Sequence, residues 1–570
     1  MSWKLRKKYN DLLANEEGYQ KKIWGELLTV CLTYQNYYRT GMSNLGFHTI
    51  YSLINHQSSF LCERAFLPDP EDEAVFTLRS IPLFSLESQT PLTDFDIIAF
   101  SVPFENDYPN ILKMLNIAGI TLSARERRET EPIIIGGGVS VTLNPEPLAD
   151  FFDLFLLGEG EEVIPEFLNI FENSRYLGLN REELLFRIQQ EIEGAYVPKY
   201  YTVTYKANHL IEKIEPANAS LPEKIRKRWI NDINTFTTDQ CISPPVAEFK
   251  ELFLTEVSRG CRHGCRFCAA GFLYRPARFR NLKTLEPSFI RGISGQKKIG
   301  LLGTAVSDHP DILSLCRYIM NNKSKVAIGS FRLDRLDSKL VSLLQESHVE
   351  TVSLAPEAGS QRLRNVIHKG ITDEHIFNAV DLLIEHGIVN IRLYFMVGLP
   401  TETEEDIEAI IDTIKKIKHH TMKCSAGKRS FKRITLSINQ FIPKPATPFQ
   451  WHPLEDINTV RKKIRKIEST LRKESSVKII HDLPKWNYIQ ALFSLGDRQV
   501  GKILLSAYKN NGNWPKAFKE VNVNPDFYVY RHKSTEEILP LDFIDHGISK
   551  QYLVAEYTKA MKHSDKHNHV

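Results

Sequence analysis

Runs of consecutive apolar residues, each followed by a helix-like stretch, recur through the first 175 residues. The apolar runs are 27–32, 96–101, 132–135 and 154–157, and helical patterns follow at 42–53, at 108–119 and after the glycines of 158–160. Continuous apolar strands that alternate with helices predict a parallel, doubly wound α/β sheet. Ligands of such sheets bind at the carboxyl ends of the strands. We therefore expect a Rossmann-like domain over 1–175 whose binding residues follow its strands.

A second alternation of strands and helices follows. Its strand patterns are 252–257, 298–303, 326–331, 350–355, 391–397 and 434–441, with helical patterns near 284–294, 310–322, 337–347, 360–386 and 403–419. Six β/α units predict a partial (β/α)6 barrel similar to a TIM barrel over 251–455. The chemistry of such a barrel belongs at the carboxyl ends of its strands.

The two remaining stretches carry weaker patterns. Residues 176–250 contain Pro198, Pro216, Pro222, Pro244 and Pro245 between short strand-like pieces, which is typical of a linker. Residues 456–570 have helical patterns at 462–472 and 489–509, and we expect a mostly helical carboxyl-terminal region.

Composition narrows the class of protein. The chain is 42% hydrophobic and 25% charged, as globular proteins are, and 73 basic against 69 acidic residues give no strong nucleic-acid signal. The charged start, 1–8, leads into no apolar run. We expect neither a signal peptide nor a membrane span, and a cytoplasmic location.

Three of the eight cysteines stand together directly after the apolar run 252–257. Cys261, Cys265 and Cys268 have the spacing C-x3-C-x2-C, whereas the other cysteines are scattered singly. Scattered cysteines do not form a disulfide framework, which fits a reducing compartment. Three thiolates on one short loop can hold an iron–sulfur cubane and leave its fourth iron open to a small molecule.

Two other interpretations of the cysteine triplet stay open at this point. A zinc ion would need a fourth ligand, from His263 or Cys316, and the cysteines could also be buried and unreactive. Arg262, His263 and Arg266 make the loop polar and electropositive, an environment that suits thiolates. This context favours the cluster.

The triplet, with the aromatic Phe267 before its last cysteine, resembles the signature of the radical S-adenosylmethionine (SAM) superfamily. The resemblance implies a 4Fe-4S cluster on the three cysteines, whose open iron takes the amino and carboxylate groups of SAM. The segments 357–370 and 394–403 are similar to the later SAM-contacting motifs of cobalamin-type and methylthio-transferring members. Cationic and carboxylate side chains there would bind the polar groups of SAM. The implied SAM contacts are Phe267, Gly303, Thr304, Arg332, Glu357, Lys369 and Gly398.

The first domain looks like the cobalamin-binding domain that precedes the barrel in one large branch of the superfamily. Where such folds bind cobalt through histidine, the loop after the first strand reads D-x-H-x-x-G, and this chain has Tyr38 at the histidine position. We therefore expect cobalamin without a histidine ligand. The implied contacts are Tyr38, Gly41, Ser101, Gly136, Gly137 and Gly138, the glycines allowing close backbone approach. The open alternative is a tight turn in a sheet that binds nothing.

Taken together, the resemblance implies an enzyme that cleaves SAM reductively at the cluster to a 5'-deoxyadenosyl radical. Methylcobalamin would then methylate a carbon, or a related C–H functionalisation would follow, on a substrate that the sequence does not name. A flavodoxin or ferredoxin would supply the electron. The motif around Gly398 and basic stretches at 415–433 and 461–473 suggest RNA methylthiolation as an alternative. Enzymes of that type usually end in a small β-barrel domain, and the helical pattern of 456–570 argues against it. A non-catalytic iron–sulfur or corrin-binding module is the third possibility.

Overall fold

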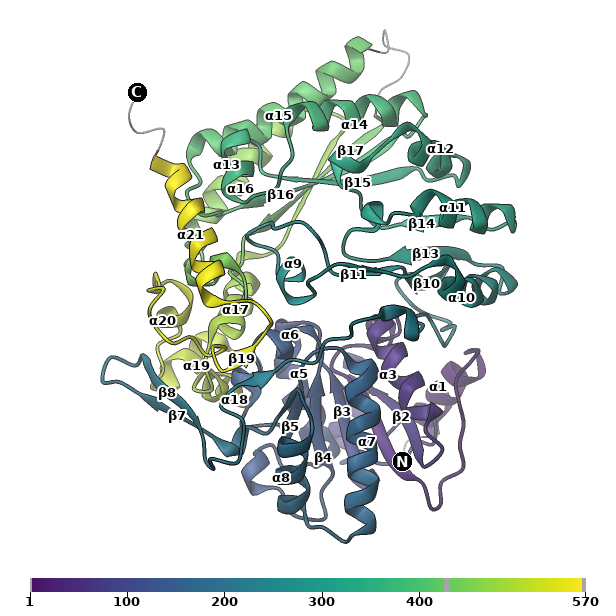
Figure 1. Ribbon diagram of the computed structural model, residues 1–570, viewed down its shortest axis with the longest axis vertical. Helices are drawn as coiled ribbons and strands as arrows, with labels where there is room; N and C mark the ends of the chain where they lie inside the picture. Colours follow the sequence, from purple (N-terminus) through teal and green to yellow (C-terminus); the bar gives the residue numbers. More distant parts are fainter. Residues whose placement is uncertain (1–2, 425–430, 566–570) are drawn as a thin grey trace.

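A computed structural model describes residues 3–424 and 431–565 of the 570-residue chain. The first sheet and its helices lie below the barrel in Figure 1, and the carboxyl-terminal helices run along one side of both. The carboxyl ends of the first sheet therefore face the barrel. This relation between the two domains creates the site described below.

The first sheet has the strand order β2-β1-β3-β4-β5-β6, and β1 to β5 are parallel. Helix α3 (Leu45–His56) packs beside α7 (Gly160–Tyr176), and α5 (Tyr108–Ala118) connects β3 to β4. Right-handed crossovers that leave β1 and β3 in opposite directions place α3 and α5 on opposite faces of the sheet. The strands are β1 Leu28–Tyr34, β2 Phe60–Phe66, β3 Ile97–Ser101, β4 Ile133–Gly137 and β5 Leu154–Leu156. The doubly wound prediction is confirmed.

Strand β2 is absent from the strands predicted above. It contains Glu63 and Arg64, which interrupt its apolar run although every residue of the strand is buried. Arg64 is stable inside the domain because it is paired at 2.6 Å with Glu16 and at 2.6 Å with Glu87. A hydrophobicity pattern does not predict this strand, because the burial of its charged residues depends on partners that are distant in sequence.

Residues 176–250, for which the prolines predict a linker, contribute regular structure to the first domain. Helix α8 (Arg181–Glu191) begins with a capping box of Asn180 and Glu183, and β6 (Ala195–Tyr196) pairs antiparallel with β5 at the sheet edge. A hairpin of β7 (Tyr201–Tyr205) and β8 (Ile211–Pro216) follows. The sheet therefore extends past residue 175.

The barrel consists of parallel strands close to the six predicted positions. Strands β10 (Leu252–Glu256), β13 (Lys298–Leu302) and β14 (Val326–Ile328) form one sheet. Strands β15 (Thr351–Glu357), β16 (Asn390–Val397) and β17 (Arg433–Gln440) form another, which β18 (Val477–His481) extends by one parallel strand. A parallel bridge from Phe331 to Leu354 joins the two sheets.

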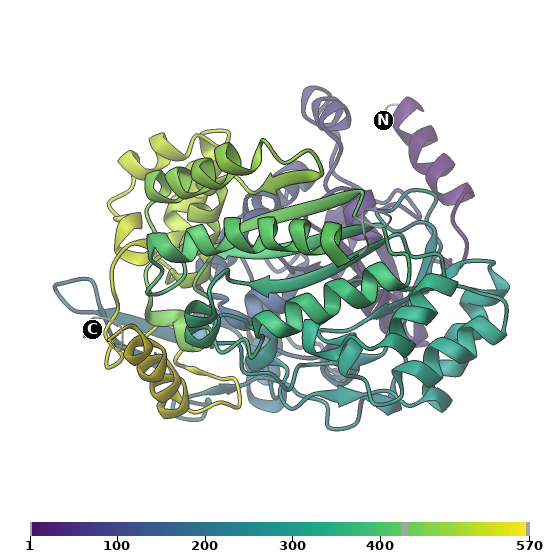
Figure 2. The same cartoon turned by 90° about the horizontal axis from the view of Figure 1, so that it is seen from above.

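Helices cover the outside of the barrel strands, as the view from above shows (Figure 2). Their inward residues form one buried core with the strands, which stabilises the parallel sheet. The barrel helices are α10 Leu282–Ser294, α11 Ile312–Asn321, α12 Ser338–Glu346, α14 Asp373–Glu385, α15 Glu404–Cys424 and α16 Ile457–Leu471.

The carboxyl-terminal region is mostly helical, as predicted, and it joins the two domains. Helix α18 (Val500–Lys509) packs on α5, and α17 (Pro484–Leu495) packs beside residues 105–107 of the first domain. Helix α21 (Lys550–Asp565) packs on α13 (Gln361–Val366) of the barrel. No helix in the described part of the chain is long and apolar enough to span a membrane.

Candidate functional site

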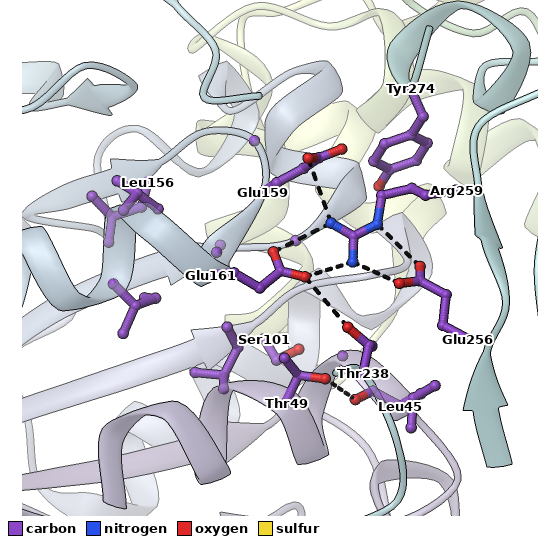
Figure 3. Close-up of a pocket in the computed structure, with 18 of the residues that line it drawn as sticks. Leu45, Thr49, Ser101, Leu156, Glu159, Glu161, Thr238, Glu256, Arg259 and Tyr274 are labelled. Carbon is purple, nitrogen blue, oxygen red and sulfur yellow. Dashed lines mark hydrogen bonds and ion pairs between the residues drawn. The ribbon is translucent and has the colours of Figure 1, made fainter. Parts of the chain in front are cut away.

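A cavity of about 420 Å³ lies between the carboxyl ends of the first sheet and the rim of the barrel (Figure 3). Strands β1, β3, β4 and β5 and helices α3 and α7 form its first wall, while the end of β10 and the loop after β13 form the other. The cavity thus stands where both α/β domains present their binding edges.

The wall from the first domain is apolar and rich in glycine. Gly138 has φ +114°, and a Cβ at this position would lie 2.7 Å from the Val102 carbonyl oxygen. A Cβ at Gly136 would lie 2.8 Å from the ring of Phe155. Gly137 differs, because the nearest atom to a Cβ there is 3.6 Å away. Close packing requires glycine at 136 and 138, whereas the position at 137 keeps the cavity open.

A buried ion network joins the barrel wall to the start of α7 in the first domain. The guanidinium of Arg259 pairs with Glu161 at 2.5 Å and Glu256 at 2.8 Å, and it lies 3.5 Å from Glu159 (Figure 3). Burial opposes ionisation of Glu256, but Arg259 and Arg280 outweigh burial and hold its pKa below the ordinary range. Glu256 therefore stays ionised beside Arg259 in the wall of the cavity.

The three cysteines lie on the loop that follows this network. The loop is closed at its base by β11 (Ser258–Arg259) and β12 (Arg278–Phe279), and it contains helix α9 (Ala270–Leu273). Cys265 is buried, and Cys261 and Cys268 are half-buried. Burial, with a smaller contribution from the other two cysteines, raises the pKa of Cys268 to about 11. Metal binding at this thiol must therefore displace its proton.

The residues present fit an iron–sulfur cubane better than a single ion. Among the residues that the structure describes, no group of three His, Cys, Asp or Glu side chains is placed to hold one metal ion. A cubane binds each thiolate to a different iron, so its ligands stand farther apart than those of one ion. His263 Nε2 lies 2.6 Å from Asp308 Oδ2, and Cys316 is buried in the barrel core. Both candidate fourth ligands for zinc are thus engaged elsewhere.

Three of the predicted SAM contacts form one hydrogen-bonded group, and two of them, Arg332 and Lys369, are close enough to Cys265 to interact with it electrostatically. Lys369 Nζ donates to Glu357 Oε1 at 3.0 Å, and Arg332 donates to the Lys369 carbonyl at 3.0 Å. Burial lowers the pKa of Lys369, but attraction to Glu357 and Cys265 outweighs burial and raises it. Glu357 has φ +70° at an irregularity of β15. Strained backbone of this kind is concentrated at functional sites.

The other predicted SAM contacts have different surroundings. Gly303 and Thr304 line the cavity and are exposed to it. Gly398 has φ +79° at the carboxyl end of β16, where its N–H donates to Glu402 at 2.8 Å. Phe267 packs against a third core that α9 shares with α13 and α21. Only part of the predicted set therefore lines the cavity or lies beside Cys265.

Only some of the predicted cobalamin contacts line the cavity. Ser101, Gly136, Gly137 and Gly138 line the cavity, whereas Tyr38 and Gly41 are not among the lining residues. The Tyr38 hydroxyl donates to Glu16 at 2.5 Å, and both Tyr38 and Gly41 pack against Phe66. The short helix Tyr38–Gly41 thus directs these residues into the domain. None of the described residues that line the cavity is a histidine.

The charged residues of the cavity mouth were not predicted. Glu159 and Glu161 start α7, whereas Glu256 ends the apolar strand β10 and Arg259 follows it, before the cysteines. Tyr274 ends the cluster loop. Their only signal in the sequence is their position at the carboxyl ends of predicted strands, where charged residues are also common in ordinary loops.

Comparisons with known proteins identify both domains. A family model described as radical SAM proteins, N-terminal, matches residues 46–198, and one described as the radical SAM superfamily matches residues 255–414. Uncharacterized protein MJ0966 of Methanocaldococcus jannaschii is 30% identical over 484 residues, which are 83% of this chain and 90% of that protein.

More distant similarities include an anaerobic magnesium-protoporphyrin IX monomethyl ester cyclase from Rubrivivax gelatinosus, 24% identical over half of each chain. Among solved structures, the radical SAM methyltransferase TsrM from Kitasatospora setae, with tryptophan and a SAM analogue bound, aligns with a TM-score of 0.46. Its identity is 13%, and the alignment covers 72% of both chains. The cysteine loop on the barrel rim and the two matching family models agree, and the chain belongs to the radical SAM superfamily.

Proposed function

We propose that this protein is a cobalamin-dependent radical SAM enzyme that transfers a methyl group to a carbon atom of its substrate. The observation that carries the proposal is the shared cavity. Gly136 to Gly138 of the first domain face Gly303 and Thr304 of the barrel across one space. Methyl transfer to a substrate carbon needs such an arrangement, because the methyl donor and the reacting carbon must meet within one enclosure.

When bound, the cluster with SAM supplies radical chemistry and the corrin supplies the methyl group. The chain's own residues position these groups. Cys261, Cys265 and Cys268 would hold the cluster, and the glycine-lined wall would accept the corrin or its tail through shape and backbone contact. Arg332 and Lys369 would meet the SAM carboxylate beside Cys265, with Glu357 available to the amino group or the ribose hydroxyls.

Gly137 offers a direct test of the cobalamin assignment. A leucine there would project into the cavity, because its Cβ would meet no atom closer than the Leu156 carbonyl oxygen, at 3.6 Å. We expect Gly137→Leu to lose cobalamin during gel filtration while it keeps its iron content, and Gly137→Ala to lose much less. Normal retention in the leucine variant, or no corrin retained by the wild type, would contradict the assignment.

A histidine-free cobalt site is supported by the lining residues. The buried His48 precedes the lining residue Thr49 on α3, but both of its ring nitrogens are engaged elsewhere. Its Nε2 lies 3.0 Å from the Met42 carbonyl, and its Nδ1 lies 3.6 Å from Cys241 Sγ. Cob(II)alamin bound to protein labelled with nitrogen-15 should show no nitrogen hyperfine splitting from the protein. Splitting from a histidine nitrogen would disprove this part of the proposal.

An assay for SAM cleavage distinguishes the enzyme from a non-catalytic cofactor-binding module. The anaerobically reduced protein should convert SAM to 5'-deoxyadenosine, and the triple cysteine variant provides the matched control. Basic residues of α16 do not favour the alternative of RNA modification, because Lys463 and Lys466 are paired with glutamates on neighbouring elements. The stretch 415–433 lies partly outside the described residues.

A further inference from the structure

Arg259 joins the first domain to the loop that carries the cysteines. Its guanidinium donates two hydrogen bonds to Glu161, at 2.5 and 3.2 Å, and two to Glu256, at 3.0 and 2.8 Å. Glu161 stands in the first turn of α7, whereas Glu256 ends β10 of the barrel. One planar side chain therefore holds one carboxylate from each domain, a geometry that arginine provides and lysine does not.

Two further arginines complete this network and fix the outer carboxylates. Arg278 pairs with Glu159 at 2.5 Å, and Arg280 pairs with Glu256 at 2.7 Å. The network thus balances three arginines against three glutamates, and each of these side chains is at most 16% exposed. Within the described chain, Arg259 is the cation paired with Glu161. Loss of either partner would leave a buried charge uncompensated.

The network lies at the base of the cluster loop. Arg259 and Arg278 are opposite each other in the short antiparallel pair of β11 and β12, and both contact Glu159. Gly260 follows with φ +81°, and a Cβ there would lie 2.0 Å from the Tyr274 carbonyl oxygen. The chain from Arg259 to Cys261 is therefore tightly confined. Arg259, which contacts α7, is thus separated from Cys261 by the single residue Gly260.

A polar atom in the same wall remains available to an occupant. Ser258 lines the cavity and is 2% exposed, and its hydroxyl has no hydrogen-bond partner among the described residues. Buried hydroxyls are normally satisfied, so this one indicates a ligand that reaches the wall beside Arg259. The network and the occupant of the cavity therefore meet at β11.

We propose that Arg259 is a positioning residue that fixes the cluster loop relative to the cavity of the first domain. It does so by holding Glu161 and Glu256 together, and the spacing between the two cofactors follows from this contact. The consequence for the cofactors rests on the function proposed above, whereas the restraint of the loop does not. The restraint of the loop and the spacing of the cofactors are therefore tested by separate measurements.

Hydrogen exchange of the full-length protein with its cluster measures the restraint directly. We expect Glu161→Gln and Arg259→Lys to accelerate amide exchange in 260–274 about tenfold, since local opening becomes easier by roughly 1.4 kcal/mol. Arg259→Lys keeps the charge but cannot hold both carboxylates. The matched control is Glu162→Gln, because Glu162 is 38% exposed and pairs with Arg228 outside the cavity. Unchanged loop exchange in both test variants, with native melting curves, would overturn the proposal.

The magnetic interaction between cob(II)alamin and the reduced cluster supplies the second measurement. It should become weaker or more heterogeneous in Glu161→Gln and Arg259→Lys, but not in Glu162→Gln. Wild-type protein that retains no corrin would contradict the proposed function, while the exchange result would still decide the restraint. If corrin is retained and the interaction is the same in all variants, Arg259 does not set the spacing.

Discussion

The two walls of the cavity use different chemistry, although both are carboxyl edges of parallel strands. The sheet edge of the first domain presents glycines and apolar residues, such as Gly137, Ile135 and Leu156, whereas the barrel rim presents Glu256 and Arg259. A glycine-lined edge selects by shape and backbone contact, whereas a charged rim binds metal and ionic groups. The carboxyl edges of parallel strands can thus bind different groups, and the residues that follow each strand decide which.

Among substitutions in the two walls, removal of the thiolates should cause the largest loss of cofactor binding and activity. The triple substitution of Cys261, Cys265 and Cys268 by alanine should abolish the cluster and SAM cleavage, because the barrel rim has no other thiolate set among its described residues. Iron quantitation and Mössbauer spectroscopy measure the loss. Cobalamin retention should stay within about twofold, since the glycine wall is intact. A cubane that survives would place the ligands elsewhere.

Glu357→Ala should have a smaller effect, confined to the barrel wall. The substitution removes the partner of Lys369 beside Cys265, and we expect SAM affinity to fall about tenfold to a hundredfold, as for a buried charge-assisted contact. Equilibrium binding to the iron-loaded protein measures this loss. Glu350→Ala, at the exposed residue before the opposite end of β15, is the control. Equal affinities of the two variants would remove Glu357 from the site.

The stability of the protein should respond to pH through His48, which is buried on α3, a helix that contributes to the first wall of the cavity. Burial lowers the pKa of His48 to about 4. Between about pH 6.5 and pH 4 the unfolded chain binds a proton that the folded chain does not, so stability falls as the pH falls. The contribution is about 3 kcal/mol. Urea unfolding of His48→Gln should show a shallower loss of stability over this range than the wild type, and equal slopes would contradict the prediction.

The sequence determined the local elements and the chemistry that they carry. Apolar runs such as 97–101 and 133–135 form strands because a parallel sheet covered on both faces needs continuous apolar residues. The cysteine loop was predictable because its three thiolates and their spacing lie within eight residues, and the resemblance of this loop indicated the superfamily. Strand β2 and the edge strand β6 escaped prediction because their burial depends on distant partners, Glu16 for Arg64 and β5 for β6.

The tertiary structure decided which residues share a site. Tyr38 follows β1 and Gly136 lies near the end of β4, but the helix after β1 directs Tyr38 toward Glu16 and Phe66. Arg259 and Glu161 are 98 residues apart and meet only because the first sheet stands under the barrel. Sequence patterns report the burial of each element against its own neighbours, whereas the orientation of one domain against another depends on long-range contacts. The cavity and its ion network are products of that orientation.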